Sequence, residues 1–342
     1  MRHRSTGRTL LAAGLFAGIA LAILPEGVDA QEQQTVTAVP ISEFSSVAAG
    51  EAVQGLIWRG GLELQSAVDT FGGLSGLGFT GPDGRLTMVS DRGNFVTGQL
   101  IYDETGRPLG LIGVRIEPIQ NSRGADLPRA FARDAEALAV IERDGVPAAL
   151  RVGFENLTRV ADFQLVDSVP EGAATEIAIP AWLTEARTNR SLESVCVAPP
   201  ASPVAGSTLL LTEDVRDDAG AQRGWLLGRA DRGDLSYRSG DGTFPADCAF
   251  LPDGDLLVLE RGVALLAFNM RLVRVAATDV RPGATMRGDV LLEVTGSDID
   301  NMEGLAVHPG PDGETRITLV SDDNFIDWQR TLLLQFSLPD GP

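Results

Sequence analysis

The sequence contains no lysine and almost no histidine, which narrows the chemistry that it can support. Its 28 basic residues are all arginine, and the two histidines are His3 and His308. Without lysine there is no G-x-x-x-x-G-K-[ST] phosphate loop, and the segment 73–77 lacks the final glycine of a G-x-S-x-G nucleophile elbow. A Ser-His-Asp triad or a His-ligated zinc is therefore not expected. Any hydrolysis would need a carboxylate base or a bound metal ion.

Basic residues are also outnumbered, since 47 acidic residues against 28 basic ones give a net charge of −19. An acidic surface repels phosphate backbones, so nucleic acid is not an expected partner, whereas cations are. Beyond the N-terminal segment, no apolar run approaches the ~18 residues of a membrane-spanning helix. Residues 1–30 have the three parts of a signal peptide: Arg2, Arg4 and Arg8, an apolar run over 10–24, and small residues before a cleavage site after Ala30. They predict export to the periplasm or beyond, with an uncleaved membrane anchor as the alternative.

One unit of two apolar strands joined by a tight turn recurs five times in the remaining chain, residues 31–342. The first copy runs from Leu74 through a turn at Pro82-Asp83-Gly84 to Val89, and an acidic run follows it. Asp-Gly between apolar runs is the strongest short hairpin signal, since glycine accepts positive φ at little cost. The copies begin at anchor residues 54–61 positions apart, which are Ser75, Glu136, Glu193, Asp247 and Glu303.

This long, regular period predicts an all-β protein, a β-propeller of five to six mostly four-stranded blades in one domain. The segment 35–64 contains strand-like runs but lacks the unit, so it would either complete the last blade or form a sixth. Completion of the last blade is favoured, because an open ring would leave an unpaired edge. The alternative is an ordinary β-sandwich, in which such a period is not typical.

Acidic residues gather at the end of each hairpin away from its turn. Residues equidistant from a turn are cross-strand neighbours, which predicts the pairs Ser75–Asp91, Glu136–Glu155, Glu193–Glu213, Asp247–Glu260 and Glu303–Asp322. On innermost strands, all five pairs would face one mouth of the central channel. Carboxylates ~5 Å apart repel by about 3 kcal/mol at an effective dielectric constant near 20, so the pairs need protons, arginines or a cation.

The acidic ring supplies the candidate site. Oxygen-only ligands with asparagine amides suit a hard cation, Ca²⁺ first and Mg²⁺ next. We expect Glu136, Glu193, Glu303 and Asp322 to act as catalytic bases or ligands. Further metal ligands are predicted at Asp91, Asn94, Glu155, Asn156, Glu213, Asp214, Asp247, Glu260, Asp323 and Asn324. Arg92 and Arg261 could bind an anionic substrate bidentately or pair with the acids. The competing interpretation is a solvated row of acidic strand ends.

Two cysteines follow the third and fourth anchors. An oxidising compartment favours a disulfide between Cys196 and Cys248. However, both lie at odd offsets from Glu193 and Asp247, which directs them into different blade interfaces unless a bulge intervenes. Two buried thiols are therefore the competing prediction.

Several of these motifs resemble a known family. The run Glu303-Gly304-Leu305-Ala306-Val307 with Ser321-Asp322-Asp323-Asn324-Phe325 looks like the signature of the phytase-like domain, known for an esterase-like activity of phytase. Segments 73–77, 90–93, 134–138 and 189–193 are similar to the family's motifs in the same order, and the resemblance covers about residues 50–340. It implies a secreted β-propeller that hydrolyses phosphate or other esters, and it supplies no agreed catalytic set.

The residues and the resemblance together favour a monomeric, metal-assisted hydrolase of a small anionic substrate or another ester, with Ca²⁺ at the acidic ring. The first alternative is a non-catalytic periplasmic binding or scaffold propeller whose acids attract a basic partner. A further alternative is a calcium-dependent lactonase-like propeller.

Overall fold

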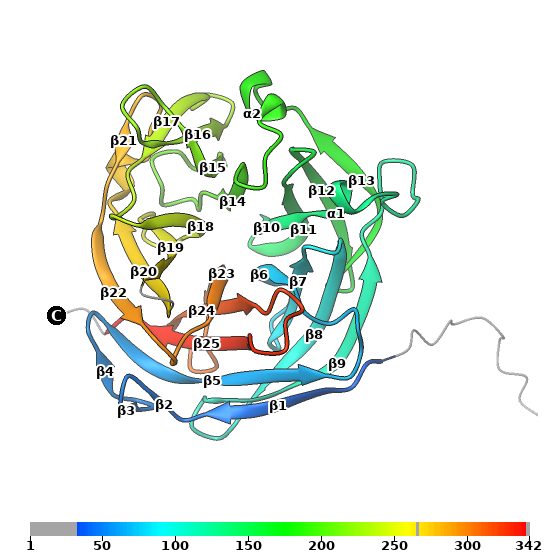
Figure 1. Ribbon diagram of the computed structural model, residues 1–342, viewed down its shortest axis with the longest axis vertical. Coiled ribbons are helices and arrows are strands. Elements are labelled where there is room, and N and C mark those ends of the chain that lie inside the picture. Colours follow the sequence, from blue (N-terminus) through cyan, green and yellow to red (C-terminus); the bar gives the residue numbers. More distant parts are fainter. Residues whose placement is uncertain (1–32, 265–266, 340–342) are drawn as a thin grey trace, which may run out of the picture. The chain divides into compact units, whose positions relative to one another are not determined.

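Five antiparallel sheets surround a central axis in the computed structural model, which describes residues 33–264 and 267–339 (Figure 1). The predicted signal peptide at 1–30 lies outside the described residues. Each sheet is one blade. In four blades the first strand in sequence lies innermost, and in the fifth the innermost strand is Asn301–Pro309. No helix among the described residues is long and apolar enough to cross a membrane.

The four complete hairpin blades follow one another along the chain. Blade 1 contains β6 (Leu74–Phe79), β7 (Arg85–Ser90), β8 (Asn94–Tyr102) and β9 (Pro108–Pro118). Blade 2 contains β10 (Ala135–Arg143), β11 (Val146–Phe154), β12 (Arg159–Val166) and β13 (Val169–Ile177). Blade 3 contains β14 (Leu192–Val197), β15 (Thr208–Arg216), β16 (Gln222–Leu227), β17 (Gly233–Tyr237) and, in parallel to β17, β21 (Thr285–Met286). Blade 4 contains β18 (Thr243–Phe250), β19 (Leu256–Ala264), β20 (Ala267–Val275) and β22 (Asp289–Thr295).

The N-terminal segment completes blade 5. The blade starts with β23 (Asn301–Pro309), β24 (Thr315–Asp322) and β25 (Thr331–Ser337) and continues with β5 (Leu56–Ser66), which pairs with β1 (Val36–Ile41) and β4 (Ala52–Val53). The register of β25 with β5 runs from Thr331↔Leu64 to Ser337↔Ile57. N-terminal closure is thus confirmed, and of the five to six predicted blades the structure has five. The ring has no open seam.

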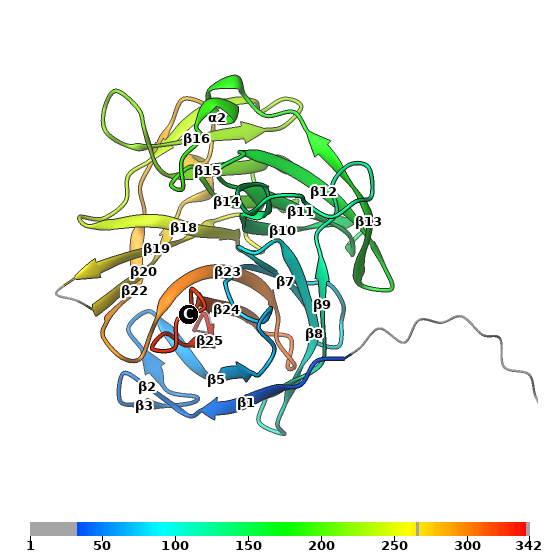
Figure 2. The same cartoon turned by 45° about the vertical axis from the view of Figure 1, so that its right-hand side comes forward.

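Short elements fill the connections. They are β2 (Glu43–Phe44), β3 (Val47–Ala48), α1 (Ala130–Arg133), α2 (Ala181–Glu185) and the 3₁₀ turn η1 (Ala277–Asp279). Figure 2 shows α2 at the outer end of the connection between blades 2 and 3.

The inner strands are apolar on both faces because each face packs against a different neighbouring blade. Leu209 and Leu211 of β15 belong to the core between blades 3 and 4, whereas Leu210 belongs to the core between blades 2 and 3. All three are at most 1% exposed. Continuous apolar runs are therefore what a strand covered on both faces requires.

Every innermost strand has a β-bulge at the same place. At this place the register shifts in each inner hairpin, between Leu74/Gly76, Ala135/Ala137, Leu192/Ser194, Pro245/Asp247 and Met302/Gly304. The extra residues are therefore Ser75, Glu136, Glu193, Ala246 and Glu303. The five predicted cross-strand pairs are wrong, because the register already differs by one residue on the turn side of the bulge and the bulge shifts it by one more: in blade 5, Gly304 faces Val320, and Asp322 faces Asn301 instead of Glu303. A bulge places two residues opposite one, which counting from the turn does not reveal.

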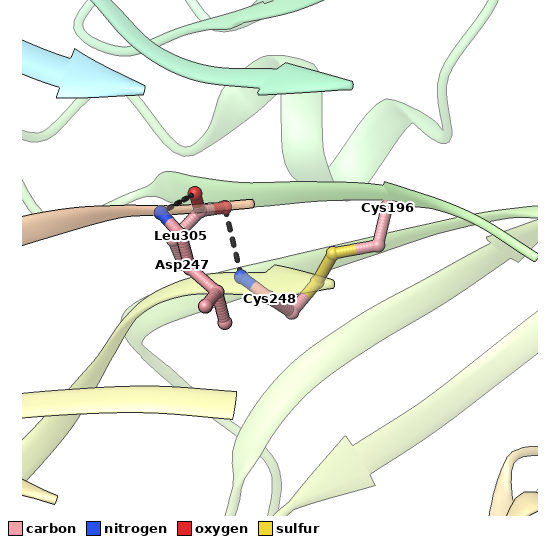
Figure 3. Close-up of a disulfide and its surroundings, with 4 residues drawn as sticks. All are labelled: Cys196, Asp247, Cys248 and Leu305. Carbon is pink, nitrogen blue, oxygen red and sulfur yellow. Dashed lines mark hydrogen bonds between the residues drawn. A yellow bond between two sulfur atoms is a disulfide. The ribbon is translucent and has the colours of Figure 1, made fainter. Parts of the chain in front are cut away.

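The bulge also determines which blade interface each cysteine faces. In blade 4 it falls at Ala246, so the anchor that the sequence placed at Asp247 is one residue late. Measured from the bulges, Cys196 and Cys248 have opposite parity and face each other across the interface between blades 3 and 4. They form a disulfide with a Cα–Cα distance of 5.9 Å (Figure 3).

Asp247 fastens the next interface. Its Oδ1 accepts the backbone N–H of Cys248, and its Oδ2 accepts that of Leu305 in blade 5 at 2.7 Å (Figure 3). The carboxyl is fully buried, and desolvation raises its pKa well above the ordinary value, against the lowering effect of these two donors. Asp247 therefore links blades 4 and 5.

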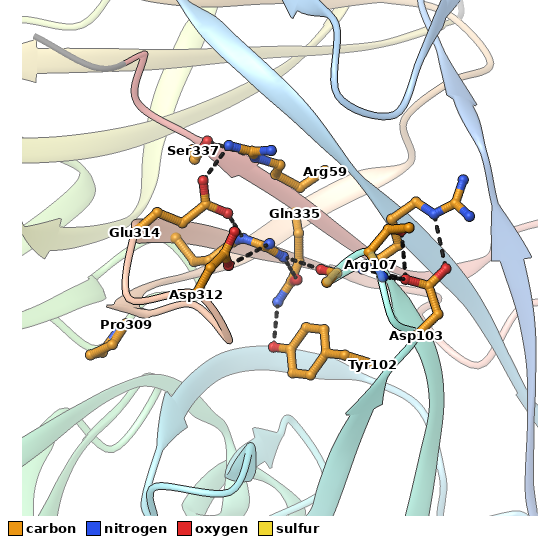
Figure 4. Close-up of polar contacts among 12 residues, drawn as sticks. Arg59, Tyr102, Asp103, Arg107, Pro309, Asp312, Glu314, Gln335 and Ser337 are labelled. Carbon is orange, nitrogen blue, oxygen red and sulfur yellow. Dashed lines mark hydrogen bonds and ion pairs between the residues drawn. The ribbon is translucent and has the colours of Figure 1, made fainter.

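A second polar network joins blade 5 to blade 1 at the turn end of the hairpins. The buried Arg316 pairs with Glu314 and Asp312 and donates to Gln335 Oε1, while Gln335 Nε2 donates to Tyr102 Oη at 3.2 Å (Figure 4). His308 lies beside it, stacked on Phe79 with 3.5 Å between ring centroids. Each polar group of this network has a partner, as a buried structural network requires.

We predict that removing the disulfide in a Cys196→Ala/Cys248→Ala variant destabilises the fold by about 4 kcal/mol. The bridge closes a sequence separation of 52 residues, and the chain-entropy model gives that magnitude for such a loop. Urea unfolding of the oxidised protein, the reduced protein and the double variant measures it. Equal midpoints for the oxidised protein and the variant would contradict the prediction.

We also predict that His308 makes the fold acid-sensitive. Burial lowers its pKa to about 4, against the raising effect of the hydrogen bond that Nδ1 donates to Pro309 O, and the charge of Arg316 lowers the pKa further. Its folded-state pKa lies below the unfolded value of ~6.5, so its stabilisation is present above pH 6.5 and is lost as the pH falls through 4. The difference in unfolding free energy between wild type and His308→Gln should fall by about 3 kcal/mol from pH 7 to pH 4. A constant difference would refute this.

Candidate acidic site at the channel mouth

The five bulges place matching residues from every blade around one end of the channel. The bulged residues form the first ring: Ser75, Glu136, Glu193, Ala246 and Glu303. A second ring lies on the second strand of each blade. Each of its members directly follows the residue that pairs with the inner-strand residue just before the bulge, and they are Asp91, Glu155, Glu213, Arg261 and Asp322. Hydrogen bonds from the N–H of Asp91, Glu155 and Glu213 to the inner strand confirm the equivalence. Blades 2, 3 and 5 thus carry glutamate at the bulge, and blade 4 carries arginine where the others carry an acid.

Three bulged glutamates converge. Carboxylate oxygens of Glu136, Glu193 and Glu303 all lie within 4.8 Å of one another, and a second such group joins Glu136 to Asp134 and Glu155. Glu193 and Glu303 are 3% and 5% exposed. An acidic cluster in this position could hold a metal ion.

Burial and mutual repulsion disfavour the charged form of these glutamates. The pKa of Glu193 is raised well above its ordinary value, first by desolvation and then by Glu155, Glu136 and Glu303. Desolvation likewise dominates the raised pKa of Glu136, followed by repulsion from Glu303. Desolvation also raises the pKa of Glu303, although Arg261 and the Asn301 amide, which donates to its Oε1 at 2.6 Å, oppose the rise. The cluster therefore requires protons or a cation.

The second ring adds acids with more moderate shifts. Desolvation raises the pKa of Glu155 and of Asp322 to about 8, with repulsion from Asp134 and Glu303 respectively contributing next among the raising effects. The pKa of Asp91 rises to about 6 through desolvation and the charge of Asp134. At neutral pH, Asp322 is mostly protonated and Asp91 mostly ionised, so these two acids of neighbouring blades differ in proton content.

Arg261 is the basic member of the ring. Its guanidinium contacts Glu303 of blade 5 at 3.1 Å and Glu213 of blade 3 at 3.7 Å, and 26% of its side chain is exposed. Burial lowers its pKa, but Glu303, Glu193, Glu213 and Glu136 outweigh that effect, and the net pKa is above the ordinary value. Arg261 stays charged and neutralises part of the mouth.

A family assignment agrees with this architecture. The family described as phytase-like, with the esterase-like activity of phytase, matches residues 69–325, which include the inner hairpins of all five blades. The chain belongs to the phytase-like family. A comparison with curated proteins finds no match.

Two solved enzyme structures are similar to this phytase-like protein at low sequence identity. The PQQ-bound aldose sugar dehydrogenase from Streptomyces coelicolor is 11% identical with a TM-score of 0.43, covering 84% of this chain and 99% of its own. An endo-arabinase from Bacteroides thetaiotaomicron is 13% identical with a TM-score of 0.47, covering 80% and 97%. At these values the likeness carries no information on substrate or chemistry.

Several predicted residues of the phytase-like site lie beside the cluster with partners of their own. Asn156 Nδ2 donates to Asp134, and Asp214 pairs with Arg190 and Arg216 at 3.0 and 2.7 Å. Asp323 accepts from Gly73 N, Phe325 N and Thr331 Oγ1, and the exposed Asn324 donates its N–H to Asp322. These contacts position the loops around the mouth.

Other predicted residues are placed away from the glutamates. Glu260 accepts from Tyr237, Thr243 and Arg271, so its carboxylate is satisfied within blades 3 and 4. Asp247 binds backbone N–H groups, as described above. Asn94 starts β8, one strand further from the channel than the ring. Arg92 stacks on Phe325 at 3.1 Å and donates to Asp69 O.

Three contributors escaped the sequence analysis as site residues: Asp134, Asn301 and Arg190. Asp134 and Asn301 occupy equivalent positions two residues before the bulged Glu136 and Glu303. Aligning the units on the bulge would have revealed this shared position. Arg190, which pairs with Glu213 at 2.9 Å and stacks on Phe244, comes from a connection with no repeated signal.

We predict that Arg261→Met lowers the unfolding free energy by about 3 kcal/mol at pH 7, because Glu303 loses its cation while Glu213 keeps its ion pair with Arg190. Losing Arg261 raises the pKa of Glu303 further. A carboxyl with a raised folded-state pKa favours folding below its unfolded pKa and loses that contribution as the pH rises, so the deficit should shrink toward pH 4.

The matched control is Arg223→Met, which removes the partly exposed ion pair with Asp234 and the stacking of Arg223 on Trp182 and should cost about 1 kcal/mol at either pH. Denaturant unfolding of both variants at pH 4 and pH 7 makes the comparison. A pH-independent deficit in Arg261→Met would refute the electrostatic explanation.

Proposed function

We propose that this phytase-like propeller is an exported hydrolase of phosphate or other esters, and that Glu136, Glu193 and Glu303 bind Ca²⁺. One observation carries the proposal: Oε2 of Glu193 is buried and has no hydrogen-bond partner among the described residues. Leaving a buried polar atom unpaired costs free energy, and more so for a carboxylate. A cation among the three glutamates would satisfy that oxygen.

The donor set fits calcium. It consists of carboxylate oxygens alone, which hard cations prefer. Two oxygens on opposite sides of Ca²⁺ lie ~5 Å apart, given ligand distances of 2.3–2.6 Å. The carboxylate oxygens of the cluster, which all lie within 4.8 Å of one another, are close enough together to bind one such cation.

Protons are the rival occupant of the cluster. The raised pKa values of Glu136 and Glu193 mean that, without a cation, these carboxyls keep their protons to a higher pH than ordinary glutamates do. Cation binding would displace those protons, so it should release protons and weaken as the pH falls. Proton release thus separates a metal site from a purely proton-sharing cluster.

The ring around the cluster supplies the remaining chemistry. The bound cation would neutralise the mouth and polarise an ester oxygen. Arg261, charged and 26% exposed, can bind an anionic group of the substrate. Asp91, with its lower pKa, is suited to accept a proton from water, and Asp322, with its higher pKa, to donate one to a leaving group.

Burial of the cluster argues for a small ligand. Glu193 and Glu303 are almost fully buried, so a basic protein partner could not reach them. A binding-only scaffold would use exposed charges. This supports the hydrolase over the scaffold alternative, and the lactonase-like alternative stays within the same site.

Export rests on two features. Residues 1–30 have the composition of a signal peptide, and Cys196 and Cys248 form a disulfide, as is typical of oxidising compartments. Both features support a periplasmic or secreted location.

We predict that the metal-stripped protein binds Ca²⁺ with proton release and gains thermal stability, and that Glu193→Gln weakens binding at least tenfold. Titration calorimetry in two buffers of different ionisation enthalpy measures the affinity for Ca²⁺ and the number of protons released, and a melting curve with and without Ca²⁺ measures the gain in thermal stability. Asp214→Asn is the matched control, because Asp214 lies at the mouth but pairs only with arginines. Equal affinities in the two variants would place calcium elsewhere.

The same proteins should then be assayed on phosphomonoesters, carboxylic esters and lactones. Glu303→Gln should lose calcium-dependent turnover while keeping its melting temperature within a few degrees. Turnover unchanged in Glu303→Gln, or unaffected by chelation, would overturn the hydrolase proposal.

A further inference from the structure

A small cavity lined by three arginines lies between blades 2 and 3. It is an open pocket of about 280 Å³, lined by Arg151 of β11, Ile177 and Ala178 at the end of β13, Gly206, Leu227 at the end of β16, and Gly228, Arg229 and Arg232 of the connection that follows. None of these lining residues is acidic, although the chain carries 47 acidic residues and only 28 basic ones. The cavity shares no residue with the acidic mouth.

Arg151 forms a fixed part of the wall. Its Nε and Nη2 bind the two oxygens of Asp162 at 2.7 and 2.8 Å, and its Nη1 donates to Thr208 Oγ1 in blade 3. The salt bridge holds the guanidinium in one orientation and neutralises its charge. Its remaining N–H groups are available as oriented donors, since Arg has five in all.

Arg229 and Arg232 supply the uncompensated charge. Both are exposed on the connection between β16 and β17. Neither has an ion pair, a side-chain hydrogen bond or a ring contact with any described residue, whereas most arginines near the acidic mouth are paired. Asp231 lies between them in sequence but does not line the cavity. The cavity is therefore a positive site on an acidic protein.

We propose that this cavity binds a small oxyanion of the phosphate type, independently of the ester chemistry proposed for the mouth. Planar guanidinium groups match phosphate oxygens in bidentate geometry, and three from two blades can surround one anion. The volume suits inorganic phosphate or the terminal phosphate of a small metabolite rather than a polymer. An anion here would neutralise Arg229 and Arg232 and bridge blades 2 and 3.

The test is calorimetric titration of the full mature chain with inorganic phosphate and with glycerol 3-phosphate, at constant ionic strength and with a chelator present. Constant ionic strength is needed because exposed charges are screened by salt. We expect saturable binding of phosphate. Tighter binding of glycerol 3-phosphate would identify a terminal phosphate as the ligand, and tighter binding of phosphate would identify the free anion.

Two double variants decide where the anion binds. Arg229→Gln/Arg232→Gln should weaken phosphate binding at least tenfold, whereas Arg281→Gln/Arg287→Gln, an exposed pair outside the cavity with the same charge change, should not alter it. Absence of binding by the wild type, or equal binding by both variants, would overturn the proposal.

Glu193→Gln separates this site from the mouth. It should leave phosphate binding unchanged, even if it abolishes calcium binding. Phosphate binding that requires calcium and disappears in Glu193→Gln would assign the anion to the mouth and refute the cavity.

Discussion

The β-bulge repeated in all five inner strands is the constraint on which the rest of the structure depends. An ordinary strand would alternate its side chains between the two blade interfaces. Inserting one extra residue re-aims a side chain, and in blades 2, 3 and 5 the inserted residue is glutamate. The same insertion in blade 4 brings Cys248 opposite Cys196 and frees Asp247 to bind Leu305. The repeated bulge thus places the glutamates at the channel mouth and permits the two contacts that join blades 3, 4 and 5.

The two ends of the inner hairpins differ in how their buried charges are satisfied. At the turn end, Arg316, Gln335 and His308 all have partners, which is the condition for a stabilising network. At the mouth, Arg261 offsets only part of the negative charge, and Glu193 keeps an unpaired oxygen. Unpaired buried polar groups of this kind are typical of ligand sites, and this contrast supports the proposal of a site at the mouth more firmly than the number of acids does.

Much of the fold followed from the sequence, and the site followed in part. Asp-Gly turns and the long period predicted the inner hairpins, and the edge that an open ring would leave unpaired favoured completion of the last blade by the N-terminal segment. Glu136, Glu193 and Glu303 were identified because they recur. Which residues are cross-strand neighbours could not be predicted, since the number of residues between strand and turn does not reveal a bulge. Arg261 was recognised as a candidate, but its place in the ring depends on the position of the bulge at Ala246, and Asp134 and Asn301 were missed as site residues for the same reason.

The account depends most on a divalent cation between the three bulged glutamates. Anomalous diffraction from crystals of the mature protein soaked in Mn²⁺, an oxygen-seeking cation with a measurable anomalous signal, tests this most directly. The account predicts one strong peak bounded by carboxylate oxygens of Glu136, Glu193 and Glu303, absent in Glu193→Gln crystals. A map with no peak at that position, or with the cation bound only elsewhere, would contradict it.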